Sequence, residues 1–211
     1  MDKGIPVIAA VLAVALLALW LLGAGQAANV APRLPGQDRT GVVVETPKVD
    51  LRGTFTKGEG VAAKLPGEWP CFRGKDCDNV SKDSTPLARS FGPEGPPLLW
   101  SVELGYGYAG PAVRNGRVYV LDYDVAKQAD ALRCLSLADG KEIWRRSYPV
   151  VVKYFHGMSR TVPSVSEKYV VSMGPKCHVL CVDADSGEYR WGLDLVREFK
   201  AEVPMWYTGQ C

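Results

Sequence analysis

The chain has 211 residues, 47% of them hydrophobic, with 25 Lys and Arg against 23 Asp and Glu. A net charge of +2 excludes a histone-like protein or any other class that binds polyanions through bulk positive charge. The charged fraction of 23% is ordinary for a globular chain, which excludes disorder over the whole length. Length by itself fits either one domain or two.

The amino-terminal segment 1–28 is predicted to be a membrane anchor or a signal peptide. Ile5 to Leu22 is an 18-residue run without a charge. As a helix it would be about 27 Å long, close to the thickness of a bilayer's hydrocarbon core. Lys3 precedes the run and favours a cytoplasmic amino end, whereas Gly25-Gln26-Ala27 offers a small-x-small cleavage site. If the segment is an uncleaved anchor, the chain is a single-pass cell-membrane protein. If it is a cleaved signal peptide, the remaining chain is secreted. Both alternatives place the rest on the periplasmic or extracytoplasmic side.

Residues 29–66 are predicted to form a flexible linker. The stretch contains four prolines, several glycines and one short apolar run, Val42 to Val44, which is a candidate strand. No helical or alternating pattern continues through it.

A repeat of about 47 residues lies within the remaining part, 67–211. The segment 132–144 (LRCLSLADGKEIW) returns as 179–191 (VLCVDADSGEYRW). The paired positions, each 47 residues apart, are Cys134 and Cys181, Gly140 and Gly187, and Trp144 and Trp191. A third, partial copy predicts a strand that ends at Trp100. Internal repeats of this period are typical of repeat architectures.

Each copy predicts four short strands bounded by turns. The expected strands, in chain order, lie near Pro111, over 117–122, 132–137 and 142–144, near Pro163, and over 169–173, 178–183 and 189–191. Gly140 and Gly187 supply the positive-φ residue that each hairpin turn needs. Repeated four-stranded units of this length indicate the blades of a β-propeller.

Each repeat has a strand, then the motif Asp/Ser-Gly-x-x-x-Trp, and then Gly-Pro or Pro-Ser-Val before the next strand. This pattern resembles the pyrroloquinoline-quinone (PQQ)-type propeller repeat. It differs from the WD40 pattern because neither Trp144 nor Trp191 is followed by Asp. The lead-in 69–81 (WPCFRGKDCDNVS) is similar to the W-P-x-F-R-G opening of exported bacterial PQQ-like propeller proteins. The resemblance covers 69–211 and implies an all-β fold, an incomplete β-propeller of four-stranded blades. About 145 residues would fill roughly three blades, so an N-terminal fragment of a propeller is expected.

The resemblance implies functions of different classes. The first is a non-catalytic scaffold or protein-binding module, by analogy with the propeller lipoprotein that assists outer-membrane β-barrel assembly, although no lipobox-like signal precedes Cys71. The alternative is the N-terminal part of a PQQ-dependent quinoprotein oxidoreductase, which would bring PQQ and calcium; a sensor ectodomain is a further rival. The chain has no adjacent cysteine pair, and its nearest calcium-like run, 183–187, coincides with a hairpin turn. No catalytic residue, cofactor or metal site is predicted.

The repeated Trp and Gly residues are interpreted as structural, because a Trp buried between blades needs a partner for its indole N–H. These residues are Trp100, Gly140, Trp144, Gly187 and Trp191.

Six cysteines in an exported chain permit disulfides. Cys71 and Cys77 could close a small loop and form the predicted disulfide, whereas Cys134 and Cys181 are expected to be buried apolar residues. The best candidate binding surface is the loop 154–160, which contains His156. Scattered basic residues argue against nucleic acid as a partner. The expected partners are the membrane and another protein.

Overall fold

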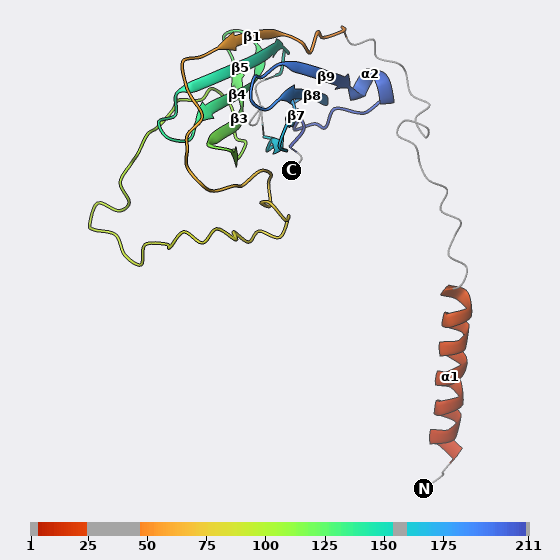
Figure 1. Ribbon diagram of the computed structural model, residues 1–211. Coiled ribbons are helices and arrows are strands. Elements are labelled where there is room, and N and C mark those ends of the chain that lie inside the picture. Colours follow the sequence, from red (N-terminus) through yellow and green to blue (C-terminus); the bar gives the residue numbers. More distant parts are fainter. Residues whose placement is uncertain (1–3, 25–46, 154–159, 210–211) are drawn as a thin grey trace. The chain divides into compact units, whose positions relative to one another are not determined.

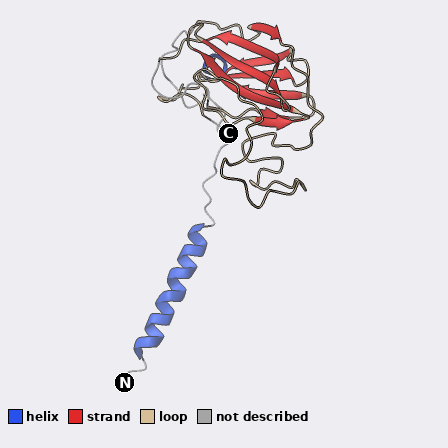
Figure 2. Cartoon of the chain, turned by 90° about the vertical axis from the view of Figure 1, so that its left-hand side faces the viewer, coloured by secondary structure: helices blue, strands red, loops and turns tan. Residues whose placement is uncertain are grey.

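The computed structural model describes residues 4–24, 47–153 and 160–209, which contain two helices and nine strands (Figure 1). The chain divides into two compact units, Met1–Asp38 and Arg39–Cys211. The predicted all-β fold is confirmed for the second unit, whose strands form two antiparallel sheets (Figure 2).

The first unit contains helix α1 (Gly4–Ala24). Its described apolar side chains, among them Leu19 and Trp20, are exposed in this structure. Among the described residues, no helix combines the length and the apolar character that crossing a membrane requires. The anchor and signal-peptide alternatives for 1–28 stay predictions.

The first sheet has five strands in the order β1-β5-β4-β3-β2. They are β1 (Thr54–Lys57), β2 (Ala112–Arg114), β3 (Arg117–Asp124), β4 (Ala129–Ser136) and β5 (Glu142–Pro149). The second sheet has the order β6-β7-β8-β9, formed by β6 (Ser164–Val165), β7 (Tyr169–Met173), β8 (His178–Asp183) and β9 (Tyr189–Asp194). We call β2–β5 blade 1 and β6–β9 blade 2.

The sequence repeat is also a structural repeat. The predicted strands 169–173 and 178–183 agree with β7 and β8. The strands after each turn are longer than predicted, because pairing with β4 and β8 continues beyond the repeat tryptophans. Both ladders have a register irregularity at the same repeat position, between Cys134 and Leu135 and between Cys181 and Val182. The two sheets are therefore two copies of one four-stranded unit.

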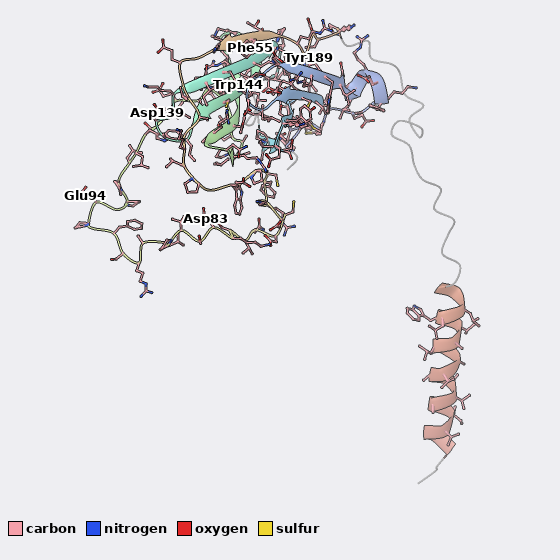
Figure 3. All side chains as sticks on the ribbon, viewed as in Figure 1. Phe55, Asp83, Glu94, Asp139, Trp144 and Tyr189 are labelled. Atoms are coloured by element: carbon pink, nitrogen blue, oxygen red, sulfur yellow. The ribbon has the colours of Figure 1, made fainter. Side chains whose placement is uncertain are left out.

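The partial copy that ends at Trp100 does not form a strand, and residues 84–99 run as a loop away from the sheets (Figure 1). Glu94 marks this outlying segment in Figure 3, and Asp83 lies directly before it. A strand needs a neighbour for its backbone, and no described strand pairs with this segment.

The linker prediction for 29–66 needs correction, because residues 54–57 form strand β1 at the edge of β5. All four β1 side chains are exposed, so no alternating apolar pattern marks the strand in the sequence. Its backbone pairs with β5 instead, and the Arg146 guanidinium lies 5.3 Å from the centre of the Phe55 ring. The candidate strand at 42–44 lies outside the described residues.

The main core lies between the two blades. Tyr119 and Trp144 from blade 1 pack with Val170, Leu180 and Val182 from blade 2, and all five are buried. The inner strands β2 and β6 lie next to each other, as adjacent blades of a propeller do.

Helix α2 (Leu195–Phe199) follows β9 directly. Asp194 caps its start by accepting hydrogen bonds from the backbone N–H groups of Val196 and Arg197. Lys200 ends it in the left-handed conformation, with φ of 53°. The following segment returns to blade 2, where the Thr208 hydroxyl donates to the Gly174 carbonyl at 2.5 Å.

Candidate protein-binding face

Trp144 joins the two blades by contacting two residues of the opposite turn. Its indole N–H donates to the Ala184 carbonyl at 3.3 Å, and its ring lies over Gly187. A Cβ at residue 187 would stand 2.6 Å from Cδ2 of the ring, closer than such carbons approach. Gly187 also has φ of 70°, a left-handed conformation that other residues adopt with strain. Glycine is therefore required here for two independent reasons.

Trp100 makes the same contact one repeat earlier. Its indole N–H donates to the Leu137 carbonyl at 3.0 Å, and a Cβ at Gly140 would stand 2.6 Å from its ring. Leu137 precedes Ala184 by 47 residues, as Gly140 precedes Gly187. The loop that contains Trp100 thus occupies, on blade 1, the place that Trp144 occupies on blade 2.

Trp191 is the third member of this series, and it has no such contact. It is 43% exposed, whereas Trp144 is 1% exposed. No described residue accepts a hydrogen bond from its indole N–H. The same residue type at the same repeat position is buried in blade 1 and open in blade 2.

Trp191 belongs to the outward face of blade 2, the face that points away from blade 1. Val171, Cys181 and Trp191 lie opposite one another on three adjacent strands and therefore share this face. Tyr169 lies two residues before Val171 on the same side, and its side chain is exposed. The opposite face carries Val170, which is buried in the core between the blades. Cys181 on the middle strand of this face is buried, whereas Tyr169 and Trp191 on the flanking strands are exposed, so these two aromatic side chains are not covered by the described residues.

Polar groups beside this face are engaged in the turn. Asp183 Oδ1 accepts from the backbone N–H groups of Asp185 and Ser186, at 3.1 and 3.0 Å, and from the Ser186 hydroxyl. Asp183 Oδ2 accepts from Arg190 at 2.8 Å. The Ser186 backbone hydrogen bond, followed by the Arg190 contact, lowers the pKa of Asp183 to about 2. These contacts assign the run 183–187 to turn formation, and no group of metal-ligating side chains occurs among the described residues.

The predicted disulfide pair lies elsewhere, before the first blade. The Sγ atoms of Cys71 and Cys77 are 3.9 Å apart, and both residues are present as free thiols. The disulfide therefore stays a prediction. Cys134 and Cys181 are buried, and burial raises the pKa of Cys134 to about 12. Residues 154–159 of the candidate loop 154–160, His156 included, lie outside the described residues.

Sequence reasoning missed the segment 49–57, which contacts the outer edges of both blades. Leu51 packs against Gly192 of blade 2, where an added Cβ would stand 2.9 Å from Leu51 Cδ1. The Arg52 guanidinium lies 5.7 Å from the centre of the Tyr189 ring, and the Arg52 carbonyl accepts from Arg146 of blade 1. Figure 3 shows Phe55 and Tyr189 at this edge. Its only apolar side chains are those of Val49, Leu51 and Phe55, and they are too few and too scattered to predict an element.

A second group that the sequence did not reveal is buried between the blades. The Tyr148 hydroxyl donates to Asp130 at 3.2 Å, and the His178 ring lies edge-on to Tyr148 with centroids 5.4 Å apart. His178 Nε2 is 3.9 Å from Asp194, and its Nδ1 is buried without a hydrogen bond. Burial lowers the pKa of His178, and the Asp194 charge partly opposes this effect. These side chains come from both blades and lie far apart in the sequence, so no local motif predicts that they meet.

Comparison with known families finds one match. Residues 89–193 and 128–210 both match the family model described as outer membrane protein assembly factor BamB, a PQQ-repeat family. Together the two matches span residues 89–210, more than half of the chain. No curated protein matches the sequence.

Proposed function

Because the chain belongs to the PQQ-repeat family described as outer membrane protein assembly factor BamB, we propose that it is a non-catalytic, membrane-anchored scaffold that binds another protein through the outward face of blade 2. The observation that carries this proposal is Trp191, which is 43% exposed although its repeat equivalent Trp144 is buried. Tryptophan is prominent among residues that dominate binding energy at protein interfaces.

The chemistry of the face favours a protein partner of a particular kind. Trp100 and Trp144 each bind a β-hairpin turn that has a left-handed glycine and a carbonyl three residues before it. Trp191 presents the same indole ring and an indole N–H without an acceptor among the described residues. We therefore expect its partner to offer a hairpin turn of this type, so that the ring is covered and the N–H is satisfied.

Membrane attachment is the second part of the proposal, and the sequence supports it. The uncharged run 5–22 follows Lys3, a pattern that favours a cytoplasmic amino end and an exported second unit. Alkaline carbonate extraction of membranes, combined with the intact mass of the mature protein, tests it. Full-length protein retained in the membrane supports the anchor. A soluble form that lacks the first 27 residues would replace the anchor by a cleaved signal, and full-length cytosolic protein would overturn both.

Binding is tested by placing a photo-crosslinking phenylalanine derivative at position 191 of the full chain in its native membrane. The matched control carries the same group at Phe91, which is 57% exposed on the outlying segment. A partner that is crosslinked from position 191, and not from 91, is then purified and titrated against the detergent-solubilised chain. We expect saturable binding that Trp191→Glu weakens at least tenfold and Phe91→Glu leaves unchanged.

Equal binding by the two variants would overturn the proposed surface.

The enzymatic alternative has its own test, because a quinoprotein oxidoreductase would bind PQQ in the presence of calcium. Saturable, calcium-dependent PQQ binding with dye-linked alcohol oxidation would overturn the scaffold role itself.

A further inference from the structure

The cysteine pair at 71 and 77 follows a segment that contacts the inner strands of both blades. Trp69 exchanges two backbone hydrogen bonds with Val113 of β2, at 2.8 and 2.9 Å. The next carbonyl, that of Pro70, accepts from the Val165 N–H of β6 at 2.8 Å. Trp69 and Pro70, which directly precede Cys71, therefore connect blade 1 to blade 2 through backbone hydrogen bonds.

The loop between the two cysteines is folded so that the thiols meet. The Gly74 N–H donates to the Cys71 carbonyl at 3.0 Å, and the Cys77 N–H donates to the Gly74 carbonyl at 3.3 Å. Gly74 and Cys77 both have positive φ, 80° and 57°, which turns the chain back on itself. The Sγ atoms are 3.9 Å apart. Formation of a bond of about 2.05 Å then requires a small side-chain movement and no rearrangement of the loop.

Exposure separates this pair from the other described cysteines. Cys77 is exposed and Cys71 is half-buried, whereas Cys134, Cys177 and Cys181 are all buried. The Cys71 thiol donates to the Gly74 carbonyl at 2.9 Å, and burial, with the adjacent Cys77 thiol, raises the pKa of Cys71. An external disulfide can reach Cys77 directly, and Cys71 stands close behind it.

A cavity of about 210 Å³ lies against the same loop. Its lining includes Lys75 and Asp76, which are located between the two cysteines, together with Trp69. Lys75 pairs with Glu68 at 3.2 Å, and Asp76 pairs with Lys82. These two ion pairs connect the loop between the cysteines to two other residues that line the cavity. A covalent link between residues 71 and 77 would fix the two lining residues that lie between them.

We propose that Cys71 and Cys77 form a reversible dithiol–disulfide site that exchanges with small-molecule disulfides, and that its oxidation fixes the wall of this cavity. In the first step the Cys77 thiolate attacks one sulfur of the incoming disulfide and releases one thiolate. In the second step the Cys71 thiolate attacks Cys77 Sγ and releases the other. The protein loses two protons and two electrons as its Sγ–Sγ bond forms, and the reagent is reduced to two thiols.

The test equilibrates the full chain, solubilised in detergent, with buffers of reduced and oxidised glutathione and then blocks free thiols with N-ethylmaleimide. Trypsin cleaves after Arg73 and Lys75, both within the loop, so a 71–77 disulfide holds the two cysteine-containing peptides together until it is reduced. We expect this linked pair, with a mass loss of two hydrogens, in wild-type protein and in the control Cys134→Ser. Cys77→Ser should abolish it.

Hydrogen exchange of residues 67–83 tests the effect on the cavity. Oxidation should slow exchange there by about tenfold or more, because the link restricts opening of the loop. Cys71→Ser, which cannot form the link, should show no difference between the two buffers. A glutathione adduct that persists on Cys77 beside an alkylated Cys71 would overturn the exchange site. Formation of the linked pair without any change in exchange would overturn its effect on the cavity wall.

Discussion

The indole ring of Trp144 lies over the α-carbon of Gly187, so that a Cβ at residue 187 would stand 2.6 Å from the ring. The same relationship joins Trp100 to Gly140. A single pair of residues thus explains why the repeat keeps both a glycine in its turn and a tryptophan four residues later. The turn glycine of a unit lies under the tryptophan ring of the unit before it. The tryptophan of the same unit lies over the turn glycine of the unit after it.

The first prediction concerns this glycine. Gly187→Ala should destabilise the fold by about 3 kcal/mol, because the new methyl combines left-handed strain with a clash against a buried ring. Urea unfolding followed by circular dichroism measures the free energy of unfolding. Gly95→Ala is the matched control, since Gly95 has φ of 75° and no atom within 4 Å of an added Cβ. Its cost should be strain alone, about 1 kcal/mol. Equal losses in the two variants would contradict the role of the ring contact.

The second prediction compares two tryptophans at the same repeat position. Trp144→Ala should cost about 3 to 5 kcal/mol, because it empties a site that is 1% exposed in the core between the blades. Trp191→Ala should cost less than about 1 kcal/mol, because that ring is 43% exposed. The free energy of unfolding of each variant in urea gives the comparison. A large loss at residue 191 would mean that the outward face is already covered within the chain.

The sequence was a good guide wherever structure followed from local pattern. Strands such as β7 and β8 are runs of β-branched and apolar residues with turns beside them, and their bounds were predicted correctly. The turn glycines were also predictable, because a hairpin of this kind needs a left-handed residue. Strand β1 was not, because its exposed residues have no apolar pattern and its partner β5 lies about 90 residues away. Only long-range backbone pairing specifies it.

The candidate site could be predicted only in part. The repeat identified Trp191 but gave it the same structural role as Trp144. The two residues differ because the turn of blade 2 covers the Trp144 ring, whereas no described residue covers Trp191 in the same way. The repeat pattern does not determine which neighbour packs on a ring. Trp100 shows the converse case. Its segment lost the strand that the repeat predicted, yet it kept the contact with Gly140, since that contact depends on one ring and one turn.

The third prediction is a pH dependence that arises from His178. Burial lowers the pKa of His178 below its ordinary value of 6.5, so the unfolded chain binds this proton more readily than the folded chain. The contribution of the neutral ring to stability is therefore complete above pH 6.5 and is lost progressively as the pH falls below that value. His178→Phe keeps an aromatic ring beside Tyr148 and cannot titrate. Urea unfolding between pH 5 and pH 7.5 should show a weaker pH dependence in this variant than in the wild type. Identical slopes would show that His178 does not contribute.

The fourth prediction has the same sign of pH dependence, because folding lowers both pKa values, but it applies to a lower pH range. Hydrogen bonds from the Ser186 backbone and from Arg190 lower the pKa of Asp183 to about 2, against 3.8 for the free side chain. The folded state thus favours the charged carboxylate, and this stabilisation is complete above about pH 4 and is lost as the pH falls towards 2. Solvent screening at this turn limits its size to about 1 kcal/mol. Asp183→Asn should lose that amount at pH 7 and little at pH 2.5, as measured by thermal unfolding at both values. Asp139→Asn, on the corresponding turn of blade 1, provides the comparison, because the Lys141 backbone N–H also lowers the pKa of Asp139 but its side-chain partners are Ser136 and the exposed Lys141 in place of an arginine. A loss at residue 183 that is the same at both pH values would assign its effect to the shape of the turn and not to its charge.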